Sequence, residues 1–278
     1  MSEGILYLVP TPLGDERDLS PRAIEVLRAV DLIAAEDTRI TLRLLQSLHI
    51  SKKLVSYHDH NETARAPWLV ERLRAGQSVA LVSDAGTPLV SDPGFRVVQA
   101  AAAAGVRVVP LPGPCAAVAA LTASGLPTDR FSFIGFLPRD PGPRRAELER
   151  LADRPETQIF YEPPHRLIET LRDVRDVWGD RRLALAFNLT KEHENILRGT
   201  VSELLAELES RERVAGEITA VVAGAERTVD DWRLPDALIR KLLDAGLEPR
   251  AIRDVICETF DLQKRAVYQR VLEAAGAK

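Results

Sequence analysis

Residues 79–94 decide the fold, and they read Val79-Ala80-Leu81-Val82-Ser83-Asp84-Ala85-Gly86-Thr87-Pro88-Leu89-Val90-Ser91-Asp92-Pro93-Gly94. An aliphatic run ends there in small, turn-forming residues. Asp92-Pro93 supplies an N-cap and a first-turn proline for a helix that continues through Val97. This order predicts a strand, a loop and a helix. The loop lies at the carboxyl end of the strand, where open α/β sheets bind their ligands.

The loop within this stretch is built from small residues and carries no cation. Ala85 and Gly86 let a ligand approach the backbone, while Asp84 and Thr87 offer polar contacts. The chain contains neither GxxxxGK[ST] nor GxGxxG, so a triphosphate or dinucleotide ligand is poorly supported. The loop therefore favours a neutral or cationic ligand, and an ordinary turn without a ligand is an equal alternative.

The composition is that of a globular protein with room for two domains. The 278 residues are 45% hydrophobic and 28% charged, with a net charge of −4. This mild acidity excludes a protein that coats nucleic acid indiscriminately, but it allows a local basic groove. Cys115 and Cys257 are too few for a disulfide framework or a zinc site. With no signal sequence or membrane-spanning run, we expect a soluble, cytoplasmic protein.

Strand and helix patterns alternate on both sides of the opening stretch, which predicts an α/β fold with a mainly parallel sheet. The expected strands of an N-terminal domain at residues 1–113 are 5–9, 31–35, 54–57, 79–82 and 106–111. The pattern then restarts and predicts a second α/β domain at residues 114–226. Its expected strands are 131–136, 157–161, 183–187 and 217–223.

The last part of the chain, residues 227–278, changes character and predicts a small helical appendage. Asp230-Asp231-Trp232 is typical of a linker, and three helical patterns follow at 235–245, 249–259 and 262–275. A plain three-helix cap explains them well, because basic and acidic residues alternate there. A helix-turn-helix-like module remains the alternative.

Polar groups that could perform chemistry gather where the expected strands end. They are Glu36-Asp37-Thr38-Arg39, His58-Asp59-His60-Asn61, Glu162 with His165-Arg166, and Lys191. His58 and His60 lack a third ligand at a typical spacing, so no metal is expected. Neighbouring Glu36 and Asp37 rarely flank a bond as glycosidase acids do, and no Gly-x-Ser-x-Gly elbow is present. The residues alone predict a two-domain enzyme whose cleft binds a phosphate-poor ligand.

Seven motifs in order along the chain carry a family resemblance. They are Leu8-Val9-Pro10-Thr11-Pro12-Leu13-Gly14, Ala35-Glu36-Asp37-Thr38-Arg39, Tyr57-His58-Asp59-His60-Asn61, residues 81–94, Leu111-Pro112-Gly113-Pro114-Cys115-Ala116, Gly135-Phe136-Leu137-Pro138, and Phe160-Tyr161-Glu162 with His165-Arg166. The chain resembles the ribosomal RNA small subunit methyltransferase I family of the tetrapyrrole methylase superfamily. The resemblance implies two α/β domains with a cleft between them and a homodimer. It also implies an enzyme that uses S-adenosylmethionine to methylate the 2′-hydroxyl of a cytidine in the decoding centre of 16S rRNA, as naked RNA or in the small ribosomal subunit.

The resemblance also suggests roles for single residues. The methyl donor would lie against Pro12, Ser83, Asp84, Ala85, Gly86, Thr87, Pro112, Gly113, Pro114, Cys115 and Ala116. Candidates for the group that takes the proton of the ribose hydroxyl are Asp37, His58 and Lys191. Candidates for contacts to RNA phosphates are Arg39, Arg139, Arg144, Arg145 and Arg166. A purely structural or solvated role is the alternative for each of these side chains.

The chain departs from the family pattern at two places. Phe187-Asn188 stand where the family usually carries an Arg-Glu pair, and Asp15 replaces a usual asparagine. The first change concerns the RNA side of the cleft more than the donor side. Two rivals to the RNA methyltransferase therefore stay open. They are a small-molecule methyltransferase acting on a tetrapyrrole and a non-catalytic RNA-binding relative.

Overall fold

The computed structural model describes residues 4–225, 236–260 and 264–276. The chain divides into two compact units, Met1–Ala225 and Glu226–Lys278, and the first unit contains two separate β-sheets. The predicted α/β class is confirmed. The exact domain boundaries at residues 113 and 226 stay predictions.

The first sheet is entirely parallel, as the alternation of strands and helices predicts. It consists of β1 (Ile5–Leu8), β2 (Leu32–Ala35), β3 (Leu54–Ser56), β4 (Val79–Val82) and β5 (Arg107–Pro110). The strands lie in the order β3-β2-β4-β1-β5, so β4 from the opening stretch is central. All four β4 residues are buried, as expected for a strand covered on both faces. The carboxyl ends of these strands consequently meet at one edge of the sheet.

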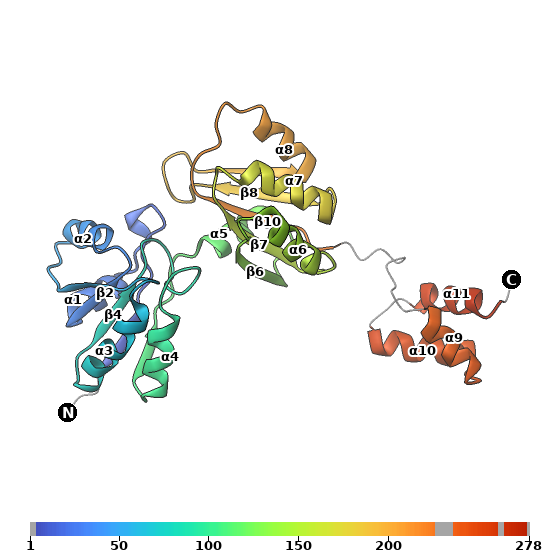
Figure 1. The fold of residues 1–278 in the computed structure, drawn as a ribbon, viewed down its shortest axis with the longest axis horizontal. Coiled ribbons are helices and arrows are strands. Elements are labelled where there is room, and N and C mark those ends of the chain that lie inside the picture. The colour runs from blue at the N-terminus through green and yellow to red at the C-terminus, as the bar shows by residue number, and fades with distance from the viewer. Residues whose placement is uncertain (1–3, 226–235, 261–263, 277–278) are drawn as a thin grey trace. The chain divides into compact units, whose positions relative to one another are not determined.

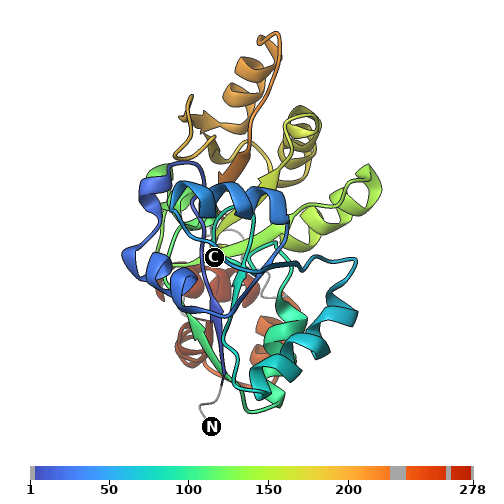
Figure 2. The ribbon, with the colours of Figure 1, turned by 90° about the vertical axis from the view of Figure 1, so that its left-hand side faces the viewer.

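Helices cover both faces of the first sheet (Figure 1). The core on one face joins the sheet to α1 (Pro21–Ala29) and α2 (Thr38–Ser47), and a short 3₁₀ helix, η1 (Glu16–Asp18), precedes α1. The core on the other face joins it to α3 (Glu62–Arg74) and α4 (Phe95–Ala103). Figure 2 shows the blue pair and the teal-to-green pair on opposite sides of the strands. This half is a three-layer α/β/α arrangement.

Helices α1 and α4 differ in how their N-termini are capped. The Ser20 hydroxyl accepts a hydrogen bond from the Ala23 amide, which confirms the predicted cap of α1. The predicted cap at Asp92 is wrong, because α4 begins at Phe95 with Gly94 as its N-cap. The loop is therefore two residues longer than expected. Asp92 therefore belongs to the loop, and it lines the pocket described below.

The second sheet is mostly antiparallel, unlike the first. It consists of β6 (Phe131–Phe136), β7 (Thr157–Glu162), β8 (Arg182–Phe187), β9 (Asn195–Thr200) and β10 (Ile218–Val222), in the order β6-β7-β10-β8-β9. Among these pairings β6–β7 alone is parallel. Strand β9 is absent from the sequence prediction. It forms a partly exposed edge strand without clear alternation of apolar residues.

Helices of the second half divide unevenly between the two faces of its sheet. The larger core joins the sheet to α6 (Pro141–Leu151), α7 (Leu167–Trp178) and α8 (Val201–Glu209). The smaller core on the other face is closed by α5 (Ala116–Ser124), a helix of small and aliphatic residues. Helix α5 follows directly on the loop after β5, so it links the two halves of the unit.

The second unit is a small helical cluster. Helices α9 (Asp236–Asp244), α10 (Pro249–Phe260) and α11 (Lys264–Ala274) pack through buried aliphatic residues such as Ile252 and Val271. The predicted linker at Asp230-Asp231-Trp232 lies outside the described residues, and the helix-turn-helix alternative stays a prediction. In the described part of the chain, none of the helices has the length and apolar character needed to cross a membrane.

Candidate functional site

The loops after β1 and β4 are tied to each other at the carboxyl edge of the first sheet. The amides of Thr11 and Gly86 each donate to the other residue's carbonyl, at 2.9 and 3.0 Å. The Thr11 hydroxyl donates to the Ser83 carbonyl at 3.1 Å, and the Ser83 hydroxyl donates to the Gly86 carbonyl at 3.2 Å. These bonds hold the backbone around Gly86 in one conformation.

The loop after β5 joins the same arrangement. The Thr87 hydroxyl donates to the Pro114 carbonyl at 2.7 Å. Gly86 has φ +84°, a conformation that favours glycine, and a Cβ there would lie 3.1 Å from Cδ2 of Leu13. Glycine is thus needed both for the turn and for the close approach of the neighbouring loop.

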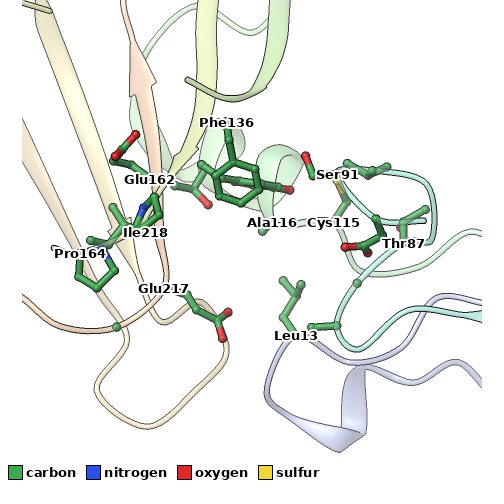
Figure 3. Close-up of a pocket in the computed structure, with 18 of the residues that line it drawn as sticks. Leu13, Thr87, Ser91, Cys115, Ala116, Phe136, Glu162, Pro164, Glu217 and Ile218 are labelled. Atoms are coloured by element: carbon green, nitrogen blue, oxygen red, sulfur yellow. The ribbon is translucent and has the colours of Figure 1, made fainter. Parts of the chain in front are cut away.

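A pocket of about 530 Å³ lies where these loops face the second sheet (Figure 3). One wall comes from the first half and from the segment that enters α5, and it contributes Leu13, Glu36, Ala85, Gly86, Thr87, Val90, Ser91, Asp92, Cys115 and Ala116. The other wall comes from the second half and contributes Phe136, Tyr161, Glu162, Pro163, Pro164, Gly216, Glu217, Ile218 and Thr219. Its size suits a nucleoside-sized ligand.

The pocket is lined by acidic residues and by no basic ones, as far as the described residues show. The four acids are Glu36, Asp92, Glu162 and Glu217. Burial raises the pKa of Glu36, and the nearby carboxylate of Asp84 adds to the effect. Burial also raises the pKa of Glu162, although the Arg166 guanidinium opposes this. Among the described lining residues, carboxyl groups are present and basic groups are not, which suits a cationic or neutral ligand better than a phosphate.

Comparisons with known proteins identify the family. Residues 5–205 match the model of the tetrapyrrole (corrin/porphyrin) methylases. The chain is 52% identical to a ribosomal RNA small subunit methyltransferase I from Micromonospora olivasterospora, over 96% of this chain and 86% of that protein. It is 47% identical to the protein of the same name from Escherichia coli O157:H7, over 99% and 97% of the two chains. The chain belongs to this family. The predicted resemblance is confirmed.

Solved structures with the same fold are more distant. The methyltransferase CobJ aligns with a TM-score of 0.60 at 22% identity, over 81% of this chain and 95% of that one. A uroporphyrin-III-C-methyltransferase from Thermus thermophilus aligns with a TM-score of 0.54 at 23% identity, over 80% and 95%. These structures share the methylase fold of this chain.

The residues predicted to hold the methyl donor divide into a group that lines the pocket and a group behind it. Ala85, Gly86, Thr87, Cys115 and Ala116 line the pocket. Pro12, Ser83, Asp84, Pro112, Gly113 and Pro114 are not among the lining residues. Several of the second group build the loops instead. For example, an Asp84 carboxylate oxygen accepts from the Asp37 amide at 2.9 Å, which joins the loop after β2 to the loop after β4.

The three candidate proton acceptors lie in different surroundings. Asp37 binds the guanidinium of Arg39. The hydrogen bonds from Arg39 lower the pKa of the Asp37 carboxyl to about 2. His58 contacts the Asn61 amide through Nε2 at 3.0 Å and does not line the pocket. Lys191 forms an ion pair with Glu217, which lines the pocket. Lys191 is therefore the candidate that the structure connects to the pocket.

The arginines predicted to contact RNA differ sharply in exposure. Arg39 and Arg139 are exposed, and the side chain of Arg145 is 47% exposed. Arg166 is mostly buried and holds Glu162 with a 2.8 Å hydrogen bond. Arg144 is fully buried, so the phosphate contact expected of it does not fit its position.

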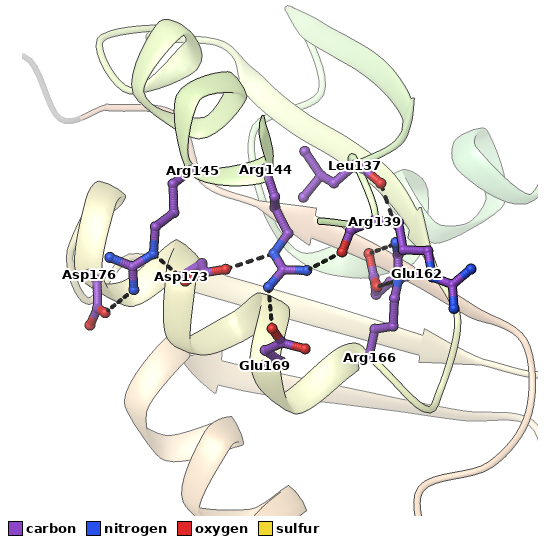
Figure 4. Close-up of polar contacts among 9 residues, drawn as sticks. All are labelled: Leu137, Arg139, Arg144, Arg145, Glu162, Arg166, Glu169, Asp173 and Asp176. Atoms are coloured by element: carbon purple, nitrogen blue, oxygen red, sulfur yellow. Dashed lines mark hydrogen bonds and ion pairs between the residues drawn. The ribbon is translucent and has the colours of Figure 1, made fainter. Parts of the chain in front are cut away.

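Arg144 instead joins α6 to α7 within the second half (Figure 4). Its guanidinium donates to Asp173 at 2.7 Å, to Glu169 at 2.8 Å and to the Arg139 carbonyl at 3.0 Å. Asp173 is shared with Arg145, also at 2.7 Å. A buried guanidinium with all these partners is a structural group, since a charge in the interior must be paired and hydrogen-bonded.

Replacing Arg144 by methionine is expected to lower the free energy of unfolding by about 2–3 kcal/mol. The expected loss of stability is smaller than that of breaking an isolated buried ion pair. Asp173 keeps its ion pair with Arg145, and the side chain of Glu169 is 56% exposed, so water can solvate it. Urea unfolding measures this value, and Arg145→Met is the matched control with an expected loss of less than about 1 kcal/mol. Equal effects of the two substitutions would contradict the structural role of Arg144.

The departures from the family pattern also have structural explanations. Phe187 is buried in the larger core of the second half, with the Arg211 guanidinium 5.8 Å from its ring centre. Asn188 has φ +50°, a conformation that asparagine tolerates well. Its amide donates to the Glu217 carbonyl at 2.9 Å, and its side-chain oxygen accepts from the Glu217 amide at 3.1 Å. Asn188 thus fixes the backbone of the pocket residue Glu217.

The structure adds pocket residues that the sequence analysis did not assign to the site. The most informative are Asp92, Phe136 and Glu217. Burial raises the pKa of Asp92 to about 7, and the Glu36 carboxylate adds to this. The glycine before Phe136 is the available signal for that residue, because glycine within a strand pattern marks a bulge. Glu217 carries no comparable signal, since it precedes an ordinary buried strand.

The raised pKa of Asp92 predicts a pH dependence of stability. The unfolded chain releases this proton near pH 3.9, and the folded protein releases it near pH 7. Between these values the folded state binds the extra proton, so stability falls as pH rises through this window and levels off above it. We expect the Tm of the wild type, relative to Asp92→Asn, to fall from about pH 5 to about pH 7.5. The exposed Asp129→Asn controls for lost charge. A constant Tm difference would contradict the prediction.

Proposed function

We propose that this chain is an S-adenosylmethionine-dependent methyltransferase that acts on ribosomal RNA of the small subunit. The observation that carries the proposal is the identity of 43–52% over nearly the whole chain to proteins named ribosomal RNA small subunit methyltransferase I. Two solved uroporphyrin-III-C-methyltransferase structures are 23% and 20% identical, and this lower similarity favours RNA over a macrocycle as substrate.

The pocket has the chemistry that this methyl donor requires. Four acids and no basic residue among the described lining residues suit a cationic ligand without phosphate. The bare backbone at Gly86 leaves room that a side chain would fill. Ala85, Gly86, Thr87, Cys115 and Ala116 would hold the donor. When bound, S-adenosylmethionine supplies a methyl group activated by its positive sulfonium.

Within this RNA, the group that we expect to be methylated is the 2′-hydroxyl of a cytidine in the decoding centre of 16S rRNA. We also propose that the protein forms a homodimer and acts in the cytoplasm. Its acceptor is either the naked RNA or the assembled small subunit. Of the arginines predicted to contact phosphates, Arg39, Arg139 and Arg145 are exposed or half-exposed, and Arg39 and Arg145 also form ion pairs with neighbouring carboxylates.

Lys191 and Glu217 form the polar group where we place the deprotonation of the ribose hydroxyl. Lys191 forms an ion pair with the pocket residue Glu217, and we assign it the role of a cation in the reaction. Lys191 would stabilise the negative charge that develops on the ribose oxygen, while Glu217 would accept the proton. Alignment of the ribose hydroxyl with the methyl group would supply much of the rate.

Three acceptors offered in parallel test the proposal. The purified protein is incubated with radiolabelled donor and small ribosomal subunits, free 16S rRNA, or a tetrapyrrole. We expect label in RNA and none in the tetrapyrrole. Label in the tetrapyrrole alone would favour the small-molecule rival. No label in any acceptor, with donor binding intact, would favour the non-catalytic one.

A further inference from the structure

Phe136 is an exposed aromatic residue in the wall of the pocket. It ends strand β6, lines the pocket and is 54% exposed. Figure 3 shows its ring over the pocket, between the loop that carries Ser91 and the strand that carries Ile218. An aromatic ring left open to solvent in a pocket is available to contact a ligand.

A β-bulge aims this ring into the pocket. In a regular strand Phe133 and Phe136 would point to opposite faces of the sheet. The register with β7 shifts here, because Phe133 pairs with Ile159 while Gly135 pairs with Phe160. Gly135 has φ +78°, which glycine adopts without strain. The extra residue turns Phe136 to the side of Phe133, which is a known effect of bulges.

The ring of Tyr161 packs against the ring of Phe136. The ring centres of Phe133 and Phe136 lie 5.0 and 5.6 Å from that of Tyr161, both edge-to-face at 64°. The Tyr161 hydroxyl accepts a hydrogen bond from the Ala117 amide at the start of α5, at 3.3 Å. Phe136 is thus held in place by its neighbours and presents a fixed flat surface to the pocket.

We propose that Phe136 is the platform on which the base of the target nucleotide stacks. The inference rests on the proposed function and names the residue that receives the RNA base. Single-stranded RNA is commonly recognised by unstacked bases on aromatic side chains. The charges agree, because the acidic lining repels phosphate but admits a neutral base. The exposed Arg139 follows three residues later, in the loop after the platform, where a phosphate could remain outside.

The wall that carries Phe136 distinguishes the RNA base from the adenine of the donor. Most residues expected to hold the donor belong to loops of the first half, and Cys115 and Ala116 lie where α5 begins, whereas Phe136 and Tyr161 belong to strands of the second half. A base stacked on Phe136 therefore enters from the wall opposite the donor loops. The attached ribose would then lie between the two walls of the pocket.

Kinetics with small ribosomal subunits that lack the methyl group test the proposal. Phe136→Ala should raise the KM for subunits about 5- to 100-fold, with kcat and the calorimetric Kd of the donor nearly unchanged. Phe136→Trp should restore the KM because it restores a stacking surface. Phe131→Ala is the matched control, since Phe131 lies on the same strand, is 45% exposed and does not line the pocket. Gly135→Ala, which strains the bulge, should raise the KM in the same direction as Phe136→Ala.

Each contrary outcome has its own meaning. A KM of Phe136→Ala equal to that of Phe131→Ala, while the wild type methylates subunits, would overturn the platform and leave the proposed function intact. If Phe136→Ala lost donor affinity by the same factor by which its KM rose, the ring would contact the donor's adenine. That result would also overturn the role of Phe136 as a platform for the RNA base. A wild type that binds donor but labels no subunits would overturn the proposed function and this inference together.

Discussion

Replacing Gly86 by arginine is expected to weaken binding of S-adenosylmethionine by more than about 100-fold, or about 2.8 kcal/mol. The new side chain would start 3.1 Å from Leu13 and extend into the pocket, where it would occupy the ligand's space. Its positive charge would also oppose the sulfonium of the donor. Isothermal titration calorimetry with the donor measures the change.

Gly105→Arg is the control for this experiment. Gly105 also has a positive φ, of +72°, but a Cβ there would meet nothing within 4 Å. Both variants carry the same backbone strain and the same added charge, so a shared loss of stability cancels in the comparison. Donor affinity of Gly86→Arg equal to that of Gly105→Arg would show that the loop around Gly86 is not a wall of the donor site.

Replacing Lys191 by methionine is expected to lower kcat about 100-fold while leaving the Kd of the donor unchanged. Methionine keeps much of the aliphatic stem but removes the ammonium that pairs with Glu217 and would stabilise the ribose oxygen. The fold should be little affected, because the side chain of Glu217 is 72% exposed and can be solvated without its partner. Single-turnover methylation of small subunits isolates this step.

The conservative variant Lys191→Arg separates the two possible roles of the lysine. An arginine stays charged, so it should retain part of the activity if Lys191 acts as a cation. It should be as inactive as methionine if Lys191 acts as a neutral base. A Lys191→Met enzyme within about threefold of the wild-type kcat would remove Lys191 from the chemistry altogether.

The first half of the fold could be predicted from the sequence because its signals are local. Buried strands such as β4 and helix caps such as Ser20 depend on residues close in the chain. The second half was predicted less well, because strand direction depends on long-range pairing. Strand β9 escaped prediction since Arg198 and Gly199 interrupt it and it pairs with β8 alone.

Only the part of the candidate site that has local sequence signals was predicted. The loop motifs around Gly86 and Cys115 identify one wall, because each follows a strand in the sequence. The opposite wall depends on a bulge that turns Phe136 and on the placement of Glu217, neither of which a local pattern fixes. The burial of Arg144 had a visible signal, since Glu169 and Asp173 lie four residues apart on one face of α7.

Methylation of small ribosomal subunits, followed by identification of the labelled nucleoside, tests the central claim most directly. Subunits lacking the modification are incubated with the protein and radiolabelled S-adenosylmethionine, and the 16S rRNA is digested to nucleosides. We expect the label in 2′-O-methylcytidine. Absence of label from the RNA, with donor binding measurable by calorimetry on the same preparation, would contradict it.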